Sequence, residues 1–313
     1  MKKWVKEKLI CPECLEKQIP LDLVIKEEQD EDIITGELGC NSCGAVYAVH
    51  DGVAIVLPKK SMSILSDSSG YNSQNMLSAY LWSHFSEFFN GPDATDAYKI
   101  WASCFQEKNG CALDIGCSVG RISFELSKTH SRVIGIDTSL PFIASARKIL
   151  NKKRLEFNMT IEGHITQERS CDLDPDWNYD RVDFIVADAM ALPFAQNCFS
   201  TVTSINILEK VPDPQGHLSS VNTVLQKENA MFMFSDPFSW DESVSAPEKW
   251  LGGTLEGKYK GRGIDNIKML FSGENHIFDP EFSIRKTGSI LWKIRKTQNL
   301  WEHIHSQFVI GER

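Results

Sequence analysis

Residues 111–121, with the sequence C-A-L-D-I-G-C-S-V-G-R, constrain the fold of this chain more than any other segment. An apolar run leads into a turn that contains two glycines, and a helix start follows the turn. Glycine lets the backbone approach a ligand without a Cβ clash, and the first turn of a helix leaves its N–H groups free. In α/β proteins such segments hold nucleoside cofactors at the carboxyl edge of a parallel sheet. The pattern therefore predicts an α/β fold with a cofactor site at this turn.

The spacing of the turn residues narrows the class of cofactor. A dinucleotide site needs G-x-G-x-x-G, whereas here Ser118 lies between Gly116 and Gly120, so a pyrophosphate is disfavoured. Asp114 lies at the strand end, where its carboxylate would repel a phosphate and attract a ligand ammonium group. We therefore expect a nucleoside that carries an amino acid, such as S-adenosylmethionine, and we expect it to face the backbone of Cys117.

The later predicted strands end in polar residues that suit the rest of such a cofactor. Asp137 ends the next strand, roughly twenty residues after the glycine turn, where a carboxylate can accept hydrogen bonds from both ribose hydroxyls. Asp188 and Ala189 follow a third strand, and the Asp188 carboxylate suits the exocyclic amine of adenine. Asn206 ends a fourth strand, where the reactive methyl group should lie. The predicted cofactor-binding residues are Asp114, Gly116, Cys117, Ser118, Gly120, Asp137, Thr138, Asp188, Ala189 and Asn206.

These segments together resemble a known family. The motifs L-D-I-G-C-S-V-G-R, G-I-D, A-D-A-M-A-L-P-F and N-I-L-E-K-V-P-D-P are similar to the successive motifs of class I S-adenosylmethionine-dependent methyltransferases, over about residues 111–236. The resemblance implies a Rossmann-like sheet with helices on both faces, S-adenosylmethionine as cofactor and a methyl-transfer activity.

Four of the nine cysteines form two C-x-x-C pairs near the N-terminus. Two thiolates three residues apart on a tight turn can bind one ion, and two such turns make a tetrahedral S₄ site. The predicted metal ligands are Cys11, Cys14, Cys40 and Cys43. Zinc with a structural role is the expected ion, and iron remains open.

Residues 9–58 resemble the zinc ribbon of the small activator proteins that partner methyltransferases. The shared features are the pattern G-x-L-x-C-x-x-C-G-x-x-Y and a D-G-V turn between two predicted strands in residues 45–58. Between the cysteine pairs, residues 21–25 predict a short strand and residues 27–32 an exposed acidic turn. The resemblance implies a structural or partner-binding role. Whether the ribbon contacts a protein partner, the substrate or the catalytic domain stays open.

The chain divides into three predicted parts: a zinc ribbon over residues 1–58, a Ser- and Asn-rich linker over residues 59–75 and a methyltransferase domain over residues 76–313. Within the last part, residues 76–110 predict helices that cover the cofactor pocket, because apolar residues recur there with helical spacing. Residues 237–280 predict an insertion on the substrate side.

The candidate catalytic residues are few, because methyl transfer from a sulfonium depends mostly on alignment and desolvation. We select Asn206, His84 and Tyr80. A second resemblance is carried by A-Y-L-W-S-H-F, E-K-W-L-G-G, Glu162-Gly163 and I-R-K-T, which look like segments of the mercaptohistidine N-methyltransferases of ovothiol biosynthesis. By position, that resemblance implies that Tyr80, His84, Trp250 and Arg295 line the substrate pocket.

The composition separates the function classes that remain. With 313 residues, 42% of them hydrophobic and 24% charged, the chain can bury a large core, and its net charge of −9 favours a small-molecule methyl acceptor over RNA. An RNA base methyltransferase would need a basic surface, and a non-enzymatic scaffold would not need intact cofactor motifs. No apolar run has the length of a membrane span or signal peptide, so we expect a cytoplasmic protein without membrane contact. The cations closest to a basic cluster are Arg285, Lys286, Lys293, Arg295 and Lys296.

Overall fold

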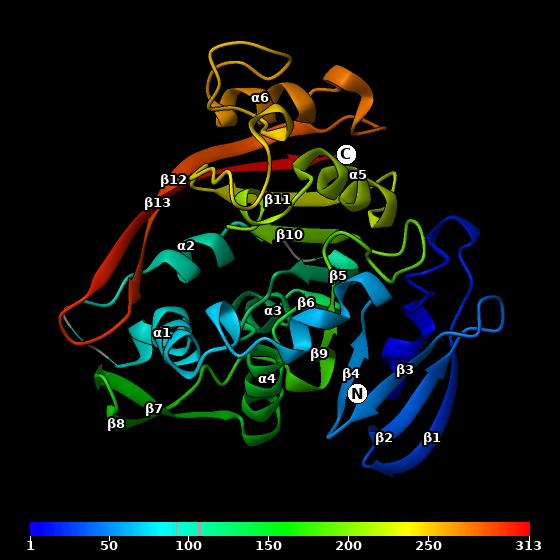
Figure 1. The fold of residues 1–313 in the computed structure, drawn as a ribbon, viewed down its shortest axis with the longest axis vertical. Coiled ribbons are helices and arrows are strands. Elements are labelled where there is room, and N and C mark those ends of the chain that lie inside the picture. The colour runs from blue at the N-terminus through cyan, green and yellow to red at the C-terminus, as the bar shows by residue number, and fades with distance from the viewer. Residues whose placement is uncertain (90, 92, 106–107) are drawn as a thin grey trace.

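The computed structural model describes residues 1–89, 91, 93–105 and 108–313. Positions 90, 92, 106 and 107 of the predicted covering segment 76–110 lie outside the described residues. Within the described part, eleven strands form one continuous sheet in the order β1-β2-β3-β4-β9-β6-β5-β10-β11-β13-β12. The N-terminal strands lie at one end of the molecule and α6 (Gly263–Phe271) lies at the other (Figure 1).

The centre of the sheet is parallel, as the alternating strands and helices predict. It consists of β5 (Lys108–Ile115), β6 (His130–Asp137), β9 (Val182–Ala187), β10 (Thr201–Ile205) and β11 (Met231–Asp236). The chain runs from β5 outward to β6 and β9, and then returns to place β10 on the other side of β5. The order of strands therefore reverses between β5 and β10, which is the place where open α/β sheets bind ligands. The Rossmann-like fold predicted from the motifs is confirmed.

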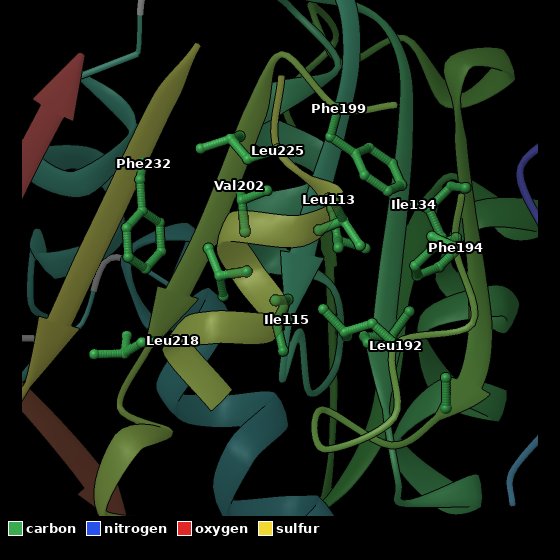
Figure 2. Close-up of a cluster of buried hydrophobic side chains, with 14 of the residues drawn as sticks. Leu113, Ile115, Ile134, Leu192, Phe194, Phe199, Val202, Leu218, Leu225 and Phe232 are labelled. Carbon is green, nitrogen blue, oxygen red and sulfur yellow. The ribbon is translucent and has the colours of Figure 1, made fainter. Parts of the chain in front are cut away.

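Alternating side chains of the central strands supply two hydrophobic layers. On one face, residues such as Leu113 and Phe232 pack against α5 (Pro214–Val224) and α6. Figure 2 shows part of this layer, in which Leu218 and Leu225 lie near Val202. The opposite face packs against four helices, namely α1 (Gln74–Phe85), α2 (Ala97–Ala102), α3 (Arg121–Leu126) and α4 (Leu140–Lys152).

Two of these helices begin as their sequences predict. The Ser139 hydroxyl accepts a hydrogen bond from the Phe142 amide at the start of α4, and the Asp213 carboxylate does the same for Gly216 in α5. Both helices have a proline in the first turn, where the missing N–H group costs no helical hydrogen bond. These caps fix where the chain leaves the strand ends that precede them.

The N-terminal ribbon extends the central sheet. Its strands are β1 (Asp22–Gln29), β2 (Asp32–Gly39), β3 (Val46–His50) and β4 (Val53–Val56), preceded by short 3₁₀ helices η1 (Lys3–Lys8) and η2 (Leu15–Lys17). The expected turn over residues 27–32 is shorter than predicted, because β1 continues to Gln29 and only Asp30 and Glu31 adopt positive φ. The last ribbon strand pairs in parallel with β9, through Ile55 with Val186 and Val56 with Ala187.

A buried arginine adds a charged contact between the ribbon and the core. Arg147 of α4 forms ion pairs with Asp32 of β2 and with Asp183 of β9. Because Arg147 is 3% exposed, one buried cation joins carboxylates from both parts of the chain. The ribbon therefore contacts the catalytic domain, with which it shares the sheet and this ion-pair cluster.

The segment predicted as a linker differs from the expected irregular chain. Residues 59–75 contain 3₁₀ helices η3 (Lys59–Ser66) and η4 (Gly70–Asn72). The Asn72 side chain donates hydrogen bonds to the backbone of Ile64 and Asp67, and Leu65 packs against the core. Short 3₁₀ turns have no long hydrophobic period, so the sequence pattern gave no indication of this order.

The remaining elements enclose the cavity or extend from it. The segment around Glu162-Gly163 is a separate hairpin of β7 (Arg154–Glu162) and β8 (Ile165–Asp172). At the C-terminus β12 (Ser283–Arg295) and β13 (Trp301–Glu312) form a long hairpin, which pairs with β11 and packs on α1. In the described ranges, no helix is long and apolar enough to span a bilayer. The other 3₁₀ helices are η5 (Ser86–Phe89), η6 (Tyr179–Arg181), η7 (Leu208–Lys210), η8 (Pro247–Lys249) and η9 (Glu274–His276).

Candidate active site and metal centre

A cavity of about 490 Å³ lies at the carboxyl ends of the central parallel strands, where the strand order reverses. This volume is in the range of small-molecule and cofactor sites. The residues predicted from the sequence that line it are Tyr80, His84, Asp114, Gly116, Cys117, Ser118, Asp137, Thr138, Asp188, Ala189 and Asn206. Gly120, Trp250 and Arg295 do not line it.

The glycine turn has the backbone geometry that its sequence requires. Gly116 has a φ of +67°, and an added Cβ would lie 1.8 Å from the Ile207 side chain. Ser118 also has positive φ, and the Cys117 amide donates to the Ile136 carbonyl of β6 at 2.9 Å. Gly120 precedes α3 with a φ of +88°, and its added Cβ would lie 2.5 Å from Phe184. Gly120 therefore shapes the turn from behind, which corrects its predicted place on the cofactor wall.

The Asp114 carboxylate lies at the base of the cavity and is 2% exposed. It accepts hydrogen bonds from the hydroxyls of Ser123 and Thr203, each at 2.7 Å. Burial raises the pKa of Asp114 to about 6, although the two hydroxyls oppose that shift. A ligand ammonium group would restore the ionised form, so the environment suits a positively charged ligand.

The Asp137 carboxylate ties the end of β6 to the glycine turn. Its oxygens accept hydrogen bonds from the Ser118 amide at 3.0 Å and the Ser139 amide at 2.9 Å. Burial raises the pKa of Asp137 to about 6, against the effect of these amides. Each oxygen retains a further lone pair, and together they can accept hydrogen bonds from a diol such as the ribose hydroxyls.

The Asp188 carboxylate has a partner that sequence reasoning missed. One oxygen accepts from the Met190 amide at 2.8 Å, and the other accepts from the Ser61 hydroxyl of η3 at 2.5 Å. Lys60, Ser61 and Ile64 of η3 all line the cavity. No motif pointed to them, because a contact across 127 positions has no counterpart in local sequence pattern.

Aromatic rings line the side of the cavity that faces α1 and the C-terminal hairpin. The Tyr80 ring lies 5.0 Å from Phe142 and 5.8 Å from both Tyr71 and Trp292, measured between centroids. His84 lies 4.5 Å from the Tyr98 ring and lines the same cavity. Burial lowers the pKa of His84 to about 3, with a smaller contribution from Arg121. The imidazole is thus neutral and a weak base at neutral pH.

Asn206 follows the end of β10 and lines the cavity beside the aromatic residues Tyr80 and Trp292. It has a φ of +58°, and its side-chain carbonyl accepts a hydrogen bond from the Ser306 hydroxyl of β13 at 2.7 Å. Its backbone N–H donates to the Ser235 carbonyl at 2.7 Å, which holds the backbone of this residue in place. These contacts fix the side chain, so the carboxamide presents a rigid polar group beside the rings.

A second, smaller cavity of about 100 Å³ adjoins the first. The two share Tyr71, Tyr80, Asn206, Lys210 and Trp292. The residues that line only the smaller cavity are Met76, Glu209, Pro237, Ile294, Lys296, Glu302 and Ile304. Sequence reasoning identified neither Tyr71 nor Trp292 as a cavity residue, and Trp292 reaches this site because β12 packs on α1.

Trp250 and Arg295 line neither cavity, although the chain neighbours of Arg295, Ile294 and Lys296, line the smaller one. The Trp250 ring stacks on Trp240 at 5.9 Å, and its indole N–H donates to the Ser245 carbonyl at 2.9 Å. Arg295 lies beside the Trp301 ring, with 5.7 Å between its guanidinium carbon and the ring centroid. The prediction that these two residues line the substrate pocket is therefore corrected, because both are engaged in packing elsewhere.

The four cysteines of the two C-x-x-C pairs come together as their spacing predicts. Their sulfur atoms all lie within 4.8 Å of one another, and those of Cys11 and Cys43 are 3.6 Å apart. The Gly44 amide donates to the Cys40 carbonyl at 2.9 Å, with a φ of +74° at Gly44. Burial tends to raise the pKa of Cys40, but the amides of Cys43 and Ser42 lower it to about 7. An all-sulfur set with this spacing fits a tetrahedral metal ion.

Comparison with known proteins agrees with this geometry. Residues 113–233 match the family model described as a methyltransferase domain. This part of the chain is a class I S-adenosylmethionine-dependent methyltransferase domain, preceded by an N-terminal cysteine cluster. The match to this domain supports a methyltransferase enzyme. No curated protein matches the chain significantly.

Three solved structures illustrate the similarity. An S-adenosylmethionine-dependent methyltransferase from Methanosarcina mazei is 18% identical, covers 68% of this chain and 96% of its own, and has a TM-score of 0.43. The YcgJ protein of Bacillus subtilis is 13% identical, with coverage of 69% and 98% and a TM-score of 0.45. A chain from the complex containing the Trm112 methyltransferase activator of Haloferax volcanii is 15% identical, with coverage of 77% and 98% and a TM-score of 0.42.

Proposed function

We propose that the protein transfers a methyl group from S-adenosylmethionine to a nitrogen or sulfur atom of a small molecule. The observation that carries the proposal is the pair of adjoining cavities, which share Tyr71, Tyr80, Asn206, Lys210 and Trp292. In this proposal the larger cavity holds the cofactor and the smaller one holds the acceptor.

Each of the three aspartates at the strand ends binds a different part of the cofactor. Asp114 attracts the ammonium group of the methionine part, Asp137 accepts hydrogen bonds from the ribose, and Asp188 accepts one from the adenine amine. The buried positions of Asp114 and Asp137 support this assignment, because burial disfavours their ionised forms despite their hydrogen bonds, and a cation or a further donor on the ligand would stabilise those forms.

The chemistry requires alignment more than acid–base catalysis. S-adenosylmethionine supplies an activated methyl group, which an acceptor lone pair can attack in line with the departing sulfur. Asn206 and the Tyr80 and Trp292 rings orient the acceptor, and the rings exclude water from the reacting atoms. The neutral imidazole of His84 lines the larger cavity and would meet the acceptor only at its reacting end, and an imidazole or thiolate acceptor brings its own lone pair.

The charges around the smaller cavity favour an acceptor that carries both a positive and a negative charge. Glu209 pairs with Lys210 at 2.9 Å, and Lys296 pairs with Glu302 at 3.2 Å. An amino-acid derivative could place its carboxylate near the lysines and its ammonium group near the glutamates. The resemblance to mercaptohistidine N-methyltransferases supports an imidazole- or thiol-containing amino-acid derivative.

The alternative of an RNA base methyltransferase receives less support from this structure. Two basic residues of β12 bond to backbone carbonyls within the chain: Arg285 to that of Cys104 and Lys293 to that of Asp93. Phosphate binding needs such cations to be available, and each would have to give up its partner.

We further propose that the cysteine cluster binds zinc and that the ribbon is a structural module, with a face available to a protein partner. No disulfide joins the nine cysteines, all of which lie in the described residues, and a reducing compartment such as the cytoplasm would keep the four clustered thiols available for zinc.

The experiment that tests the proposed reaction follows an isotopically labelled methyl group. The protein is incubated with a cell metabolite extract and methyl-labelled S-adenosylmethionine, and small molecules and RNA are analysed separately by mass spectrometry. We expect one labelled small molecule with wild type and none with Asp137→Ala, which should lose cofactor affinity. Label found only in RNA would support the alternative activity, and label in neither fraction, with no cofactor binding, would support a scaffold.

A further inference from the structure

The first cysteine turn contacts the start of the segment that borders the cofactor cavity. Glu13 lies between Cys11 and Cys14, and its carboxylate accepts a hydrogen bond from the Lys59 amide at 2.5 Å. Lys59 is the first residue of η3, three residues after the end of β4. The metal-binding turn therefore holds the N-terminal end of η3.

That short helix forms part of the cavity wall. Ser61 is 7% exposed, and its hydroxyl donates to the Asp188 carboxylate at 2.5 Å. Its amide donates to the Pro58 carbonyl at 2.9 Å, which fixes the turn between β4 and η3. Only one residue separates Lys59, whose amide bonds to Glu13, from Ser61, whose hydroxyl bonds to Asp188.

A second connection reaches Asp188 from the same turn by a different path. The Ile10 amide donates to the Pro193 carbonyl at 2.9 Å, and the Ala195 amide donates to the Lys8 carbonyl at 3.1 Å. These contacts hold the loop that begins at Asp188. Two apolar residues of that loop, Leu192 and Phe194, point toward Ile134 in Figure 2 and belong to the same hydrophobic cluster as Cys11, Cys14 and Cys40.

We propose that the metal-binding turn positions the adenine side of the cofactor site, with Glu13 and Ser61 as positioning residues. This inference depends on the proposed placement of adenine at Asp188. Apart from the isolated bridge between Ile10 and Pro20, residues 10–20 contain only the three-residue helix η2, so the clustered thiolates and a bound metal would hold much of this segment in place. Loss of the metal would loosen η3 and the loop after β9 together, and would weaken cofactor binding from a distance.

The first test uses calorimetric titration of the full-length zinc-loaded protein with S-adenosylhomocysteine. We expect Glu13→Ala and Ser61→Ala each to weaken binding about three- to tenfold, since each removes one hydrogen bond. Glu13→Gln keeps an acceptor oxygen and should bind nearly as wild type. Glu16→Ala, an exposed carboxylate in the same segment, is the matched control and should have no effect.

The double variant with Glu13→Ala and Ser61→Ala tests whether the two residues lie on one path. We expect its affinity for S-adenosylhomocysteine to equal that of the single variant that binds less tightly, because the effects of two substitutions on one structural element do not add. Independent effects that multiply would overturn the path through η3. Wild-type affinity in both single variants would overturn the whole proposal.

The second test removes the metal by chelation or by Cys11→Ser. We expect affinity for S-adenosylhomocysteine to fall more than about tenfold, and hydrogen exchange of residues 59–66 to rise while β5 and β10 stay protected. A metal-free protein with unchanged affinity contradicts the inference. If the zinc-loaded wild type itself binds no S-adenosylhomocysteine, the proposed cofactor site fails first, and the two failures are thereby distinguished.

Discussion

Cofactor affinity should depend steeply on pH, because two buried carboxylates of the cofactor cavity have raised pKa values. Burial raises the pKa of Asp114 and Asp137 to about 6, well above the usual value for aspartate. Above that pH both are ionised and attract the ammonium and ribose groups of the cofactor. Below it they become protonated, and the attraction is lost, so affinity falls as the pH is lowered.

The size of the effect follows from these pKa values. At pH 5 a carboxyl group with a pKa of about 6 is ionised in about one molecule in eleven. If both groups must be ionised to bind, the affinity for S-adenosylhomocysteine should fall roughly 100-fold between pH 8 and pH 5. The buried His84 and His217 should not contribute, since burial lowers their pKa values to about 3 and about 4.

The assay is calorimetric titration at intervals of half a pH unit, with two controls. Asp137→Asn should bind more weakly at pH 8 and should show the dependence of a single carboxyl group, roughly tenfold over the same range. Adenosine lacks the amino-acid part, so the pH dependence of its affinity should also be that of a single carboxyl group, Asp137. An affinity for S-adenosylhomocysteine that stays constant from pH 8 to pH 5 would refute the assignment of both aspartates.

Three further predictions concern the turn, the core and the acceptor cavity. Gly116→Ala should destabilise the protein by about 1–3 kcal/mol in denaturant titrations, because its Cβ would overlap Ile207, whereas Gly44→Ala, with open space around it, should cost less. Burial raises the pKa of Asp236 to about 8, so between pH 5 and pH 8 the folded state holds a proton that the unfolded state has lost. The free energy of unfolding of the wild type should therefore fall by about 1.4 kcal/mol per pH unit over this range, relative to that of Asp236→Asn. Parallel curves of stability against pH for the two proteins would contradict this. Lys296→Ala should raise the KM for an identified acceptor about tenfold and leave the dissociation constant of S-adenosylhomocysteine unchanged, with Lys293→Ala as the control; an equal effect of both variants would argue against the acceptor site.

Features encoded by local spacing were predictable from the sequence. Asp114, Asp137 and Asp188 each follow an apolar run, and parallel strands carry such residues to a common edge. The four ribbon cysteines likewise lie on tight turns whose spacing specifies the cluster. In both cases the local sequence determines the geometry of each strand end or turn, and the fold brings these strand ends or turns together.

Features that depend on long-range packing were not predictable in this way. Ser61 reaches Asp188 only because β4 joins the sheet beside β9, and no pattern in residues 53–56 identifies that neighbour. Trp292 reaches the cavity because the hairpin of β12 and β13 folds over α1. The error for Trp250 has the same origin: a resemblance in sequence placed it in the pocket, while stacking on Trp240 holds it elsewhere.

We expect the cavity between the ends of β5 and β10 to bind S-adenosylmethionine with its reactive end toward the smaller aromatic cavity. A crystal structure with S-adenosylhomocysteine tests this most directly. We expect adenine beside Asp188, ribose on Asp137 and the sulfur atom directed toward Asn206 and Trp292. A ligand bound with its sulfur directed away from the smaller cavity, or bound elsewhere on the protein, would contradict the account.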